Sequence, residues 1–107
     1  MQFNLNKSIL NPIANLNKAF ENRSRLGIMS VLMVNDWIDF NALKELLDLT
    51  DGNLSSHISS LEELVYIEIK KEFVGKKPKT SYRATLSGRE AFNNHLEALE
   101  NLINFNK

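Results

Sequence analysis

The chain has 107 residues, the length of one ordinary domain, and 43% of them are hydrophobic, which is enough for a modest core. It contains no cysteine, which excludes disulfides, zinc–thiolate sites and thiol catalysis. Its 13 Lys and Arg balance its 13 Asp and Glu, so no global basic field marks it as a binder of nucleic acid.

Signals for export or for membrane insertion are missing from the sequence. No apolar run approaches the roughly 20 residues that a membrane-spanning helix needs. The first residues, MQFNLNKSILNP, lack the basic region and the apolar block of a signal peptide. We therefore expect one cytoplasmic domain over residues 1–107 that contacts no membrane.

A first helix is predicted within residues 1–21. Asn11 suits an N-cap and Pro12 suits the first helical position. An apolar stripe then follows at helical spacing, formed by Ile13, Leu16 and Phe20.

Two further helices and a short strand are predicted next. Asn22 begins a helix in which residues 26–33 are apolar nearly all round, so it should be central and buried. The segment NDWIDF breaks that helix, and its residues 38–40 suit a short strand. Asn41 is a candidate N-cap for a third helix.

A fourth helix is predicted over residues 51–64, in the segment LTDGNLSSHISSLEEL. Thr50 suits its N-cap, and the linker from the third helix is only about three or four residues, as in a helix-turn-helix. Leu54, Ile58 and Leu61 recur at i, i+4 and i+7, so they should point inward.

After this helix the hydrophobic period changes to two. Residues 66–74 (YIEIKKEFV) and 81–86 (SYRATL) alternate apolar and polar, which predicts a β-hairpin. The connecting segment 75–80 (GKKPKT) has the Gly and Pro of a turn and carries three lysines.

The predicted order is helix, helix, strand, helix, helix, hairpin, helix, which is mainly α with a small β-hairpin. Over about residues 22–103 the sequence resembles small winged helix-turn-helix transcriptional regulators related to the MarR and ArsR families. The most specific pieces are LTDGNLSSHISSLEE and GKKPKTSYRATLSGRE, in that order and followed by a helical tail. The resemblance implies a DNA-binding regulator whose winged-helix core spans residues 22–86.

One position departs from the pattern of these regulators. They usually have glycine where this chain has Val65, and glycine there allows a left-handed C-cap. Because valine disfavours a left-handed backbone, we expect the helix to end differently and to run on into Tyr66.

The polar face of the 51–64 helix is the first candidate binding surface. At 100° per residue, Ser56, Ser59 and Ser60 point outward and Asn53 lies on the shoulder. Serine and asparagine are weak helix formers, so their presence calls for another reason. Short side chains let a helix approach bases in the major groove, and Asn can pair bidentately with adenine. The alternative is a face that is merely solvated.

The lysine-rich turn is the second candidate surface. Residues 70–89 hold seven Lys or Arg, and only one acid, Glu72, opposes them before Glu90. Lysines at a hairpin tip suit contacts to phosphates or to the minor groove, which orient a protein without selecting a sequence. The alternative is that they keep the hairpin edges from aggregating.

Three arginines are also candidates. Arg83, near the turn, is predicted to reach the DNA backbone, with Glu68 or Glu72 as alternative partners. Arg23 and Arg25 open the second helix and either lie against phosphates or are solvated, and the sequence leaves both readings open.

The predicted DNA-binding residues come from the helix and the hairpin. They are Thr50, Asn53, Ser55, Ser56, His57, Ser59, Ser60, Lys76, Lys77, Lys79, Thr80 and Arg83. His57 should lie near the DNA backbone, whereas His95 should pack inside. Two distant histidines predict no metal site, and no catalytic constellation is present, so we expect no metal, no cofactor and no enzyme.

A last helix is predicted within residues 87–107, with Ser87 and Glu90 as a capping box and an end near Phe105. Its apolar face is broader than one contact requires, so we expect a homodimer that spaces two reading helices about 34 Å apart. The predicted interface residues are Ile9, Ile13, Leu16, Phe92, Leu96, Leu99, Leu102 and Ile103. The alternative is a monomer whose last helix folds back.

The function predicted from these features is sequence-specific binding to double-stranded DNA by a homodimeric transcriptional regulator. Helix 51–64 would enter the major groove, and turn 75–80 would lie on the backbone or in the minor groove. The alternative is a winged-helix module for protein–protein interaction that does not bind DNA. MarR-like regulators also bind small effectors, but this chain is short and no polar cluster in it marks a pocket.

Overall fold

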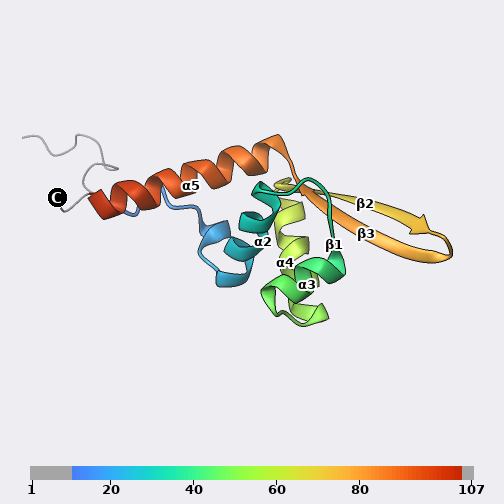
Figure 1. Ribbon diagram of the computed structural model, residues 1–107. Helices are drawn as coiled ribbons and strands as arrows, with labels where there is room; N and C mark the ends of the chain where they lie inside the picture. Colours follow the sequence, from blue (N-terminus) through green and yellow to red (C-terminus); the bar gives the residue numbers. More distant parts are fainter. Residues whose placement is uncertain (1–10, 105–107) are drawn as a thin grey trace, which may run out of the picture.

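Two long projections extend from opposite sides of a small helical body (Figure 1). The computed structural model describes residues 11–104. Its elements are η1 (Lys18–Phe20), α2 (Arg23–Met33), β1 (Ile38–Asp39), α3 (Phe40–Leu47), α4 (Asp51–Glu63), β2 (Ile67–Val74), β3 (Lys77–Ala84) and α5 (Leu86–Asn104). Within this part of the chain, no helix is long and apolar enough to cross a membrane.

The prediction of a helix that begins at Asn11 is wrong. Residues 12–15 form turns, and only the short 3-10 helix η1 follows. The side chains of Asn11 and Asn17 accept hydrogen bonds from the amides of Ile13 (3.1 Å) and Ala19 (2.9 Å), respectively. These local bonds compete with helical ones, so the segment breaks into turns.

Two of the predicted helix starts are confirmed. The side chain of Asn22 accepts from the amides of Ser24 and Arg25, both at 3.0 Å, and begins α2. The hydroxyl of Thr50 accepts from the amide of Asn53 at 3.1 Å and begins α4.

Two other predicted caps lie too far along the chain. Asp39, not Asn41, caps α3, because its carboxylate accepts from the amide of Ala42 at 2.8 Å. Thr85, not Ser87, caps α5, which begins at Leu86. Asp39 is the last residue of β1 and Thr85 directly follows β3, so each helix begins as soon as its strand ends.

Three antiparallel strands form one sheet in the order β1-β3-β2. The hairpin of β2 and β3, residues 67–84, is the wing. Its turn has two residues, Gly75 and Lys76, so the predicted six-residue turn is too long. Since β1 pairs only with residues 81–82, the outer side of β3 is free at Pro78, which has no amide to donate.

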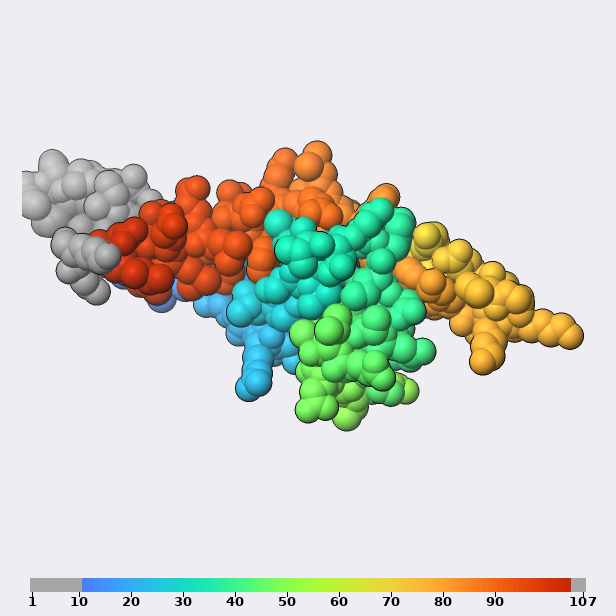
Figure 2. Space-filling model, in the orientation of Figure 1, coloured from blue at the N-terminus to red at the C-terminus, as the bar shows by residue number. Residues whose placement is uncertain are grey.

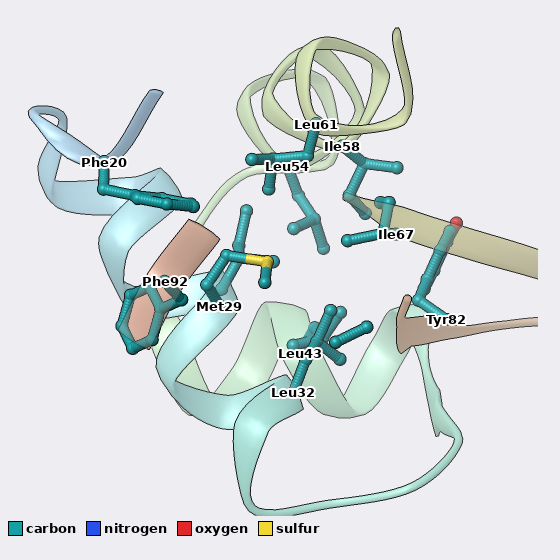
Figure 3. Packing of buried hydrophobic residues seen from close by; sticks show 12 residues of the cluster. Phe20, Met29, Leu32, Leu43, Leu54, Ile58, Leu61, Ile67, Tyr82 and Phe92 are labelled. Atoms are coloured by element: carbon teal, nitrogen blue, oxygen red, sulfur yellow. The ribbon is translucent and has the colours of Figure 1, made fainter. Parts of the chain in front are cut away.

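The core lies where α4, α2 and α3 meet the base of the wing. The three inward residues predicted for α4, Leu54, Ile58 and Leu61, are at most 4% exposed, and Ile58 lies beside Ile67 at the base of the wing (Figure 3). This packing leaves the opposite face of α4 to solvent. α5 joins the same core near its start, and its far half projects beyond the body (Figure 1).

The end of α4 contradicts the expectation for Val65. This residue has a left-handed backbone, with φ of 62°, as glycine would. The amide of Val65 donates to the Glu62 carbonyl at 2.9 Å, and the amide of Tyr66 donates to the Leu61 carbonyl at 3.0 Å. These two bonds form a Schellman motif, so tertiary contacts impose on valine the turn that its own preference opposes.

Candidate nucleic-acid interface

The outward side of α4 carries short polar side chains. Asn53, Ser55, Ser56 and Ser59 are exposed, and we call these four residues the reading face. Ser60 is half-buried, and its hydroxyl donates to the Ser56 carbonyl at 3.2 Å, so it is partly engaged within the helix. No residue of α4 is Lys or Arg. The reading face therefore presents neutral hydrogen-bonding groups, the exposed charges of α4 are the acids Asp51, Glu62 and Glu63, and cations for phosphates must come from other elements.

Two cations lie directly beside α4: Lys44, whose Nζ is 2.7 Å from a carboxylate oxygen of Asp51, and Arg25. The guanidinium of Arg25 is fixed by a 2.7 Å bond from its Nε to the Ala19 carbonyl, and its Nη1 lies 3.3 Å from Nδ1 of His57. Because a guanidinium only donates, His57 must accept at Nδ1 and is neutral in this arrangement. Burial, and then the charge of Arg25, lower the pKa of His57 below its usual value. The neighbouring Arg23 is exposed at the start of α2.

The wing supplies a second group of cations. Lys76 occupies the turn, and Lys77 and Lys79 lie along β3, all three exposed. Thr80 is half-buried further down the same strand. Figure 2 shows the wing as a thin arm that leaves the body, so the lysines near its turn lie away from the body.

Arg83 is held at the base of the wing. Its guanidinium donates from Nε and Nη2 to Glu68 and lies 3.4 Å from a carboxylate oxygen of Asp36. It also stacks over the ring of Trp37 at 4.4 Å, and Lys70 approaches that ring at 4.5 Å. Pairing with Glu68, the alternative that the sequence allowed, is therefore present.

The role of Trp37 in this cluster is not apparent from the sequence. The signal that could have found part of it is strand register, which places Glu68 opposite Arg83 in the hairpin. The cluster ties the loop before β1 to both strands of the wing, so it fixes the direction in which the wing leaves the body.

The residues predicted for the dimer differ in how deeply their own chain buries them. Phe92 is only 4% exposed and meets Phe20 edge-on at 5.1 Å, so its side chain belongs to the core of its own chain. Ile13, Leu96 and Ile103 are exposed. The others, Leu16, Leu99 and Leu102, are half-buried, and Ile9 lies outside the described residues.

His95 is buried, as predicted, at 3% exposure. Its Nδ1 accepts a 3.0 Å bond from the amide of Asn17, whose side chain donates to the hydroxyl of Tyr66 at 3.1 Å. This chain of bonds fixes the segment before η1 against α5. Between residues 11 and 104, no three His, Asp or Glu side chains are placed to hold a metal ion.

The sequence and the fold both match those of known proteins. The sequence model of the winged helix DNA-binding domain matches residues 24–103. The chain belongs to this family. The resemblance to winged-helix regulators is confirmed, and family and fold point to a DNA-binding regulator rather than to an enzyme.

Similar sequences and structures agree with this assignment. The chain is 40% identical to the uncharacterized protein MJ0432 of Methanocaldococcus jannaschii over 79 residues, which cover 74% of this chain and 86% of that protein. It is 32% identical to a transcriptional regulator homologue protein from Pyrococcus horikoshii OT3, with a TM-score of 0.77 over 92% of both chains. The MarR-family regulator of Silicibacter pomeroyi shares the fold at 12% identity, with a TM-score of 0.62 over 92% of this chain and 65% of that one.

Proposed function

We propose that the chain is a homodimeric transcriptional regulator that reads a specific sequence of double-stranded DNA. The reading face of α4 would enter the major groove, and the wing would lie on the backbone or in the adjacent minor groove. The observation that carries this proposal is the exposed row of Ser and Asn side chains on α4, opposite its buried Leu54, Ile58 and Leu61. Short side chains allow the close approach of helix to bases that direct readout needs.

Cations on both sides of the reading face support this geometry. Arg23 and Arg25 lie on one side, and the wing lysines lie on the other. Phosphate contacts from both would orient the duplex along α4 while leaving sequence selection to the neutral face.

Selection of duplexes from a random pool, followed by sequencing, tests the proposal directly. The expected result is a palindrome whose half-sites are about 10 base pairs apart, because twofold symmetry would repeat the contacts after one turn of DNA. A set of bound sequences without a shared motif would contradict sequence-specific reading.

The double variant Asn53→Ala/Ser56→Ala tests base readout. It should weaken binding to the selected operator at least tenfold and binding to random duplex much less, since base contacts carry discrimination. Ser30→Ala is a matched control, because Ser30 is an exposed helical serine on α2 whose hydroxyl donates only to its own helix, to the Leu26 carbonyl. Equal losses on operator and random duplex would refute readout by α4.

The homodimer is proposed from α5, which is about 28 Å long for its 19 residues and carries exposed Leu96 and Ile103. Leu96→Glu should shift the protein from dimer to monomer in sedimentation at micromolar concentration. Leu46→Glu is the control, because Leu46 is a similarly exposed leucine on α3. A wild-type monomer at this concentration would contradict the dimer.

The alternative to this proposal is a protein-interaction module that does not bind DNA. The binding of such a module to its partner would not weaken steeply with salt, whereas DNA binding by a wing that contacts phosphates would.

A small-molecule effector is a separate question. One structural neighbour, NadR, was solved in complex with 4-hydroxyphenylacetate and shares the fold at 15% identity, with a TM-score of 0.68. We propose no effector for this chain.

A further inference from the structure

The far end of the wing exposes apolar side chains that the charge of the wing does not explain. Phe73 is 73% exposed and Val74 is 58% exposed, and both precede the turn at Gly75. A tip that served only to carry lysines would gain nothing from an aromatic ring in water, since exposed apolar area is unfavourable. Pro78 is also exposed and is paired with Phe73, so the two form a contiguous apolar surface at the tip, and such a surface indicates a contact.

The register of the hairpin places the two residues on opposite faces. Phe73 is opposite Pro78, and they continue the face that packs on the core further down, through the pair Ile69 and Tyr82. Val74 is opposite Lys77 and belongs to the other face. Phe73 and Pro78 thus form one apolar ridge, and Val74 provides a matched apolar residue beside it.

This ridge is presented on a stiff arm. In the turn only Gly75 has a positive φ, 69°, as in the two-residue type II′ turn whose twist suits a hairpin. Pro78 has a fixed φ, and the bonds from Arg83 to Glu68 and Asp36 brace the base. Ordering costs on binding are therefore small, which makes a contact by the ridge more favourable.

The arm is long enough to reach the next groove. Seven residue steps from Ile67 to Val74 extend about 23 Å at about 3.3 Å per residue. Adjacent major and minor grooves are separated by half of a turn of about 34 Å, or about 17 Å along the duplex. A wing that leaves the end of α4 therefore spans the distance from the major groove to the neighbouring minor groove.

We propose that Phe73, backed by Pro78, inserts into the minor groove as an apolar wedge against the sugar walls, while lysines beside it hold the phosphates. This inference rests on the proposed function and names a residue of the same DNA-binding surface. The surrounding charge favours a polyanion over an apolar protein or a lipid interior. Lys71, Lys76, Lys77 and Lys79 flank the ridge, and Glu72 is the one acid among the residues of β2 and β3 from 71 to 80. Apolar side chains placed in the minor groove in this way are a known means of gripping duplexes.

Binding to the selected operator over a series of salt concentrations tests the wedge. Phe73→Ala should weaken binding about tenfold at every salt concentration, because burial of one aromatic ring is lost. The slope of log affinity against log salt should stay that of the wild type, because no phosphate contact is removed. Val74→Ala, on the other face, should change affinity less than twofold. Both side chains are largely exposed, so circular dichroism and urea unfolding should show both variants folded as the wild type.

A second measurement tests whether the contact lies in the minor groove. Netropsin, which occupies the minor groove at A·T steps, should compete with the wild type and should compete less with Phe73→Ala. Wild-type affinity in Phe73→Ala, or an equal loss in Val74→Ala, overturns the wedge. Loss of self-association instead of DNA affinity in Phe73→Ala overturns it too and points to a protein contact. If the wild type binds no duplex at all, the proposed function fails. If it binds, and substitution of Lys76, Lys77 and Lys79 weakens binding whereas Phe73→Ala does not, only the wedge fails.

Discussion

Thr85 donates a hydrogen bond from its Oγ1 to the carbonyl oxygen of Val65, at 2.6 Å. The same hydroxyl accepts from the amide of Gly88 at 2.9 Å and so caps α5. The Thr85 amide also donates to the carbonyl of Tyr66 at 3.0 Å. Thr85, which directly follows β3, therefore joins the end of α4 to the start of α5.

Val65→Gly should stabilise the protein by about 1 kcal/mol. A left-handed backbone costs an L-residue about 1–2 kcal/mol, and glycine avoids this cost while losing more chain entropy on folding. Little burial is lost because the valine is 63% exposed. Urea denaturation measures the change. Val34→Gly is the control, because Val34 is also exposed and has an ordinary φ of −107°. Equal destabilisation in both variants would show that Val65 is not strained.

Gly88→Ala should destabilise the protein by about 3 kcal/mol, as overpacking in a close contact does. A Cβ at this position would lie 2.0 Å from the Tyr66 carbonyl oxygen, so the start of α5 would have to move away from the end of α4. Gly52→Ala is the control, because a Cβ there meets nothing within 4 Å and alanine favours the helix. The expected thermal melting temperatures fall for Gly88→Ala and rise or stay unchanged for Gly52→Ala.

The sequence predicted α4 and the wing well because their signals are local. Thr50 caps α4 with its own side chain, and the inward residues at i, i+4 and i+7 need only helical geometry. Val65 could not be predicted in the same way. The carbonyl of Val65 accepts a hydrogen bond from Thr85, twenty residues further on, and no local sequence preference predicts that bond. The broken first helix is a different case, because the side chains of Asn11 and Asn17 bond to amides only two residues further on.

In the candidate site, too, features set by local sequence were predictable and features set by distant contacts were not. The exposure of the reading face follows from helix periodicity, so a single sequence predicts which α4 residues face outward. The arrangement of Arg83 depends on Trp37 and Asp36 in a loop more than forty residues away, and such contacts leave no periodic signal. Position on a surface was therefore predictable, and Glu68 could be offered as a partner of Arg83, whereas the contacts of Arg83 with Asp36 and Trp37 could not be predicted. Contact with DNA itself stays a prediction for every residue of the site.

Stability should fall on acidification from about pH 7.5 to about pH 5.5, in part through His95. Burial lowers the pKa of His95 below its usual value, although the charge of Glu21 opposes this shift. The unfolded chain therefore takes up the proton first as the pH falls through about 6.5. The stability that neutral His95 contributes is fully present above about pH 6.5. It is lost as the pH falls through the pKa that His95 has in the folded protein. Protonation also removes the acceptor at Nδ1 that holds the amide of Asn17.

Urea denaturation at the two pH values checks this expectation in the wild type and in His95→Gln. The variant should lose less stability on acidification, because glutamine does not titrate. His57→Gln provides the comparison, since the pKa of His57 is lowered as well and its removal should flatten the profile independently. An identical pH profile in wild type and His95→Gln would contradict the assignment to His95.

Salt dependence should separate the wing lysines from Arg83. The triple variant Lys76→Ala/Lys77→Ala/Lys79→Ala should make the slope of log affinity against log salt shallower by up to about 2.7, since each phosphate contact contributes about 0.9. Arg83→Ala should leave the slope nearly unchanged, because its guanidinium already donates to Glu68 and lies against Asp36. It should instead alter the fluorescence of Trp37, on which Arg83 stacks. A triple variant with the wild-type slope would show that the lysines do not contact phosphates. A shallower slope in Arg83→Ala would show that Arg83 contacts a phosphate.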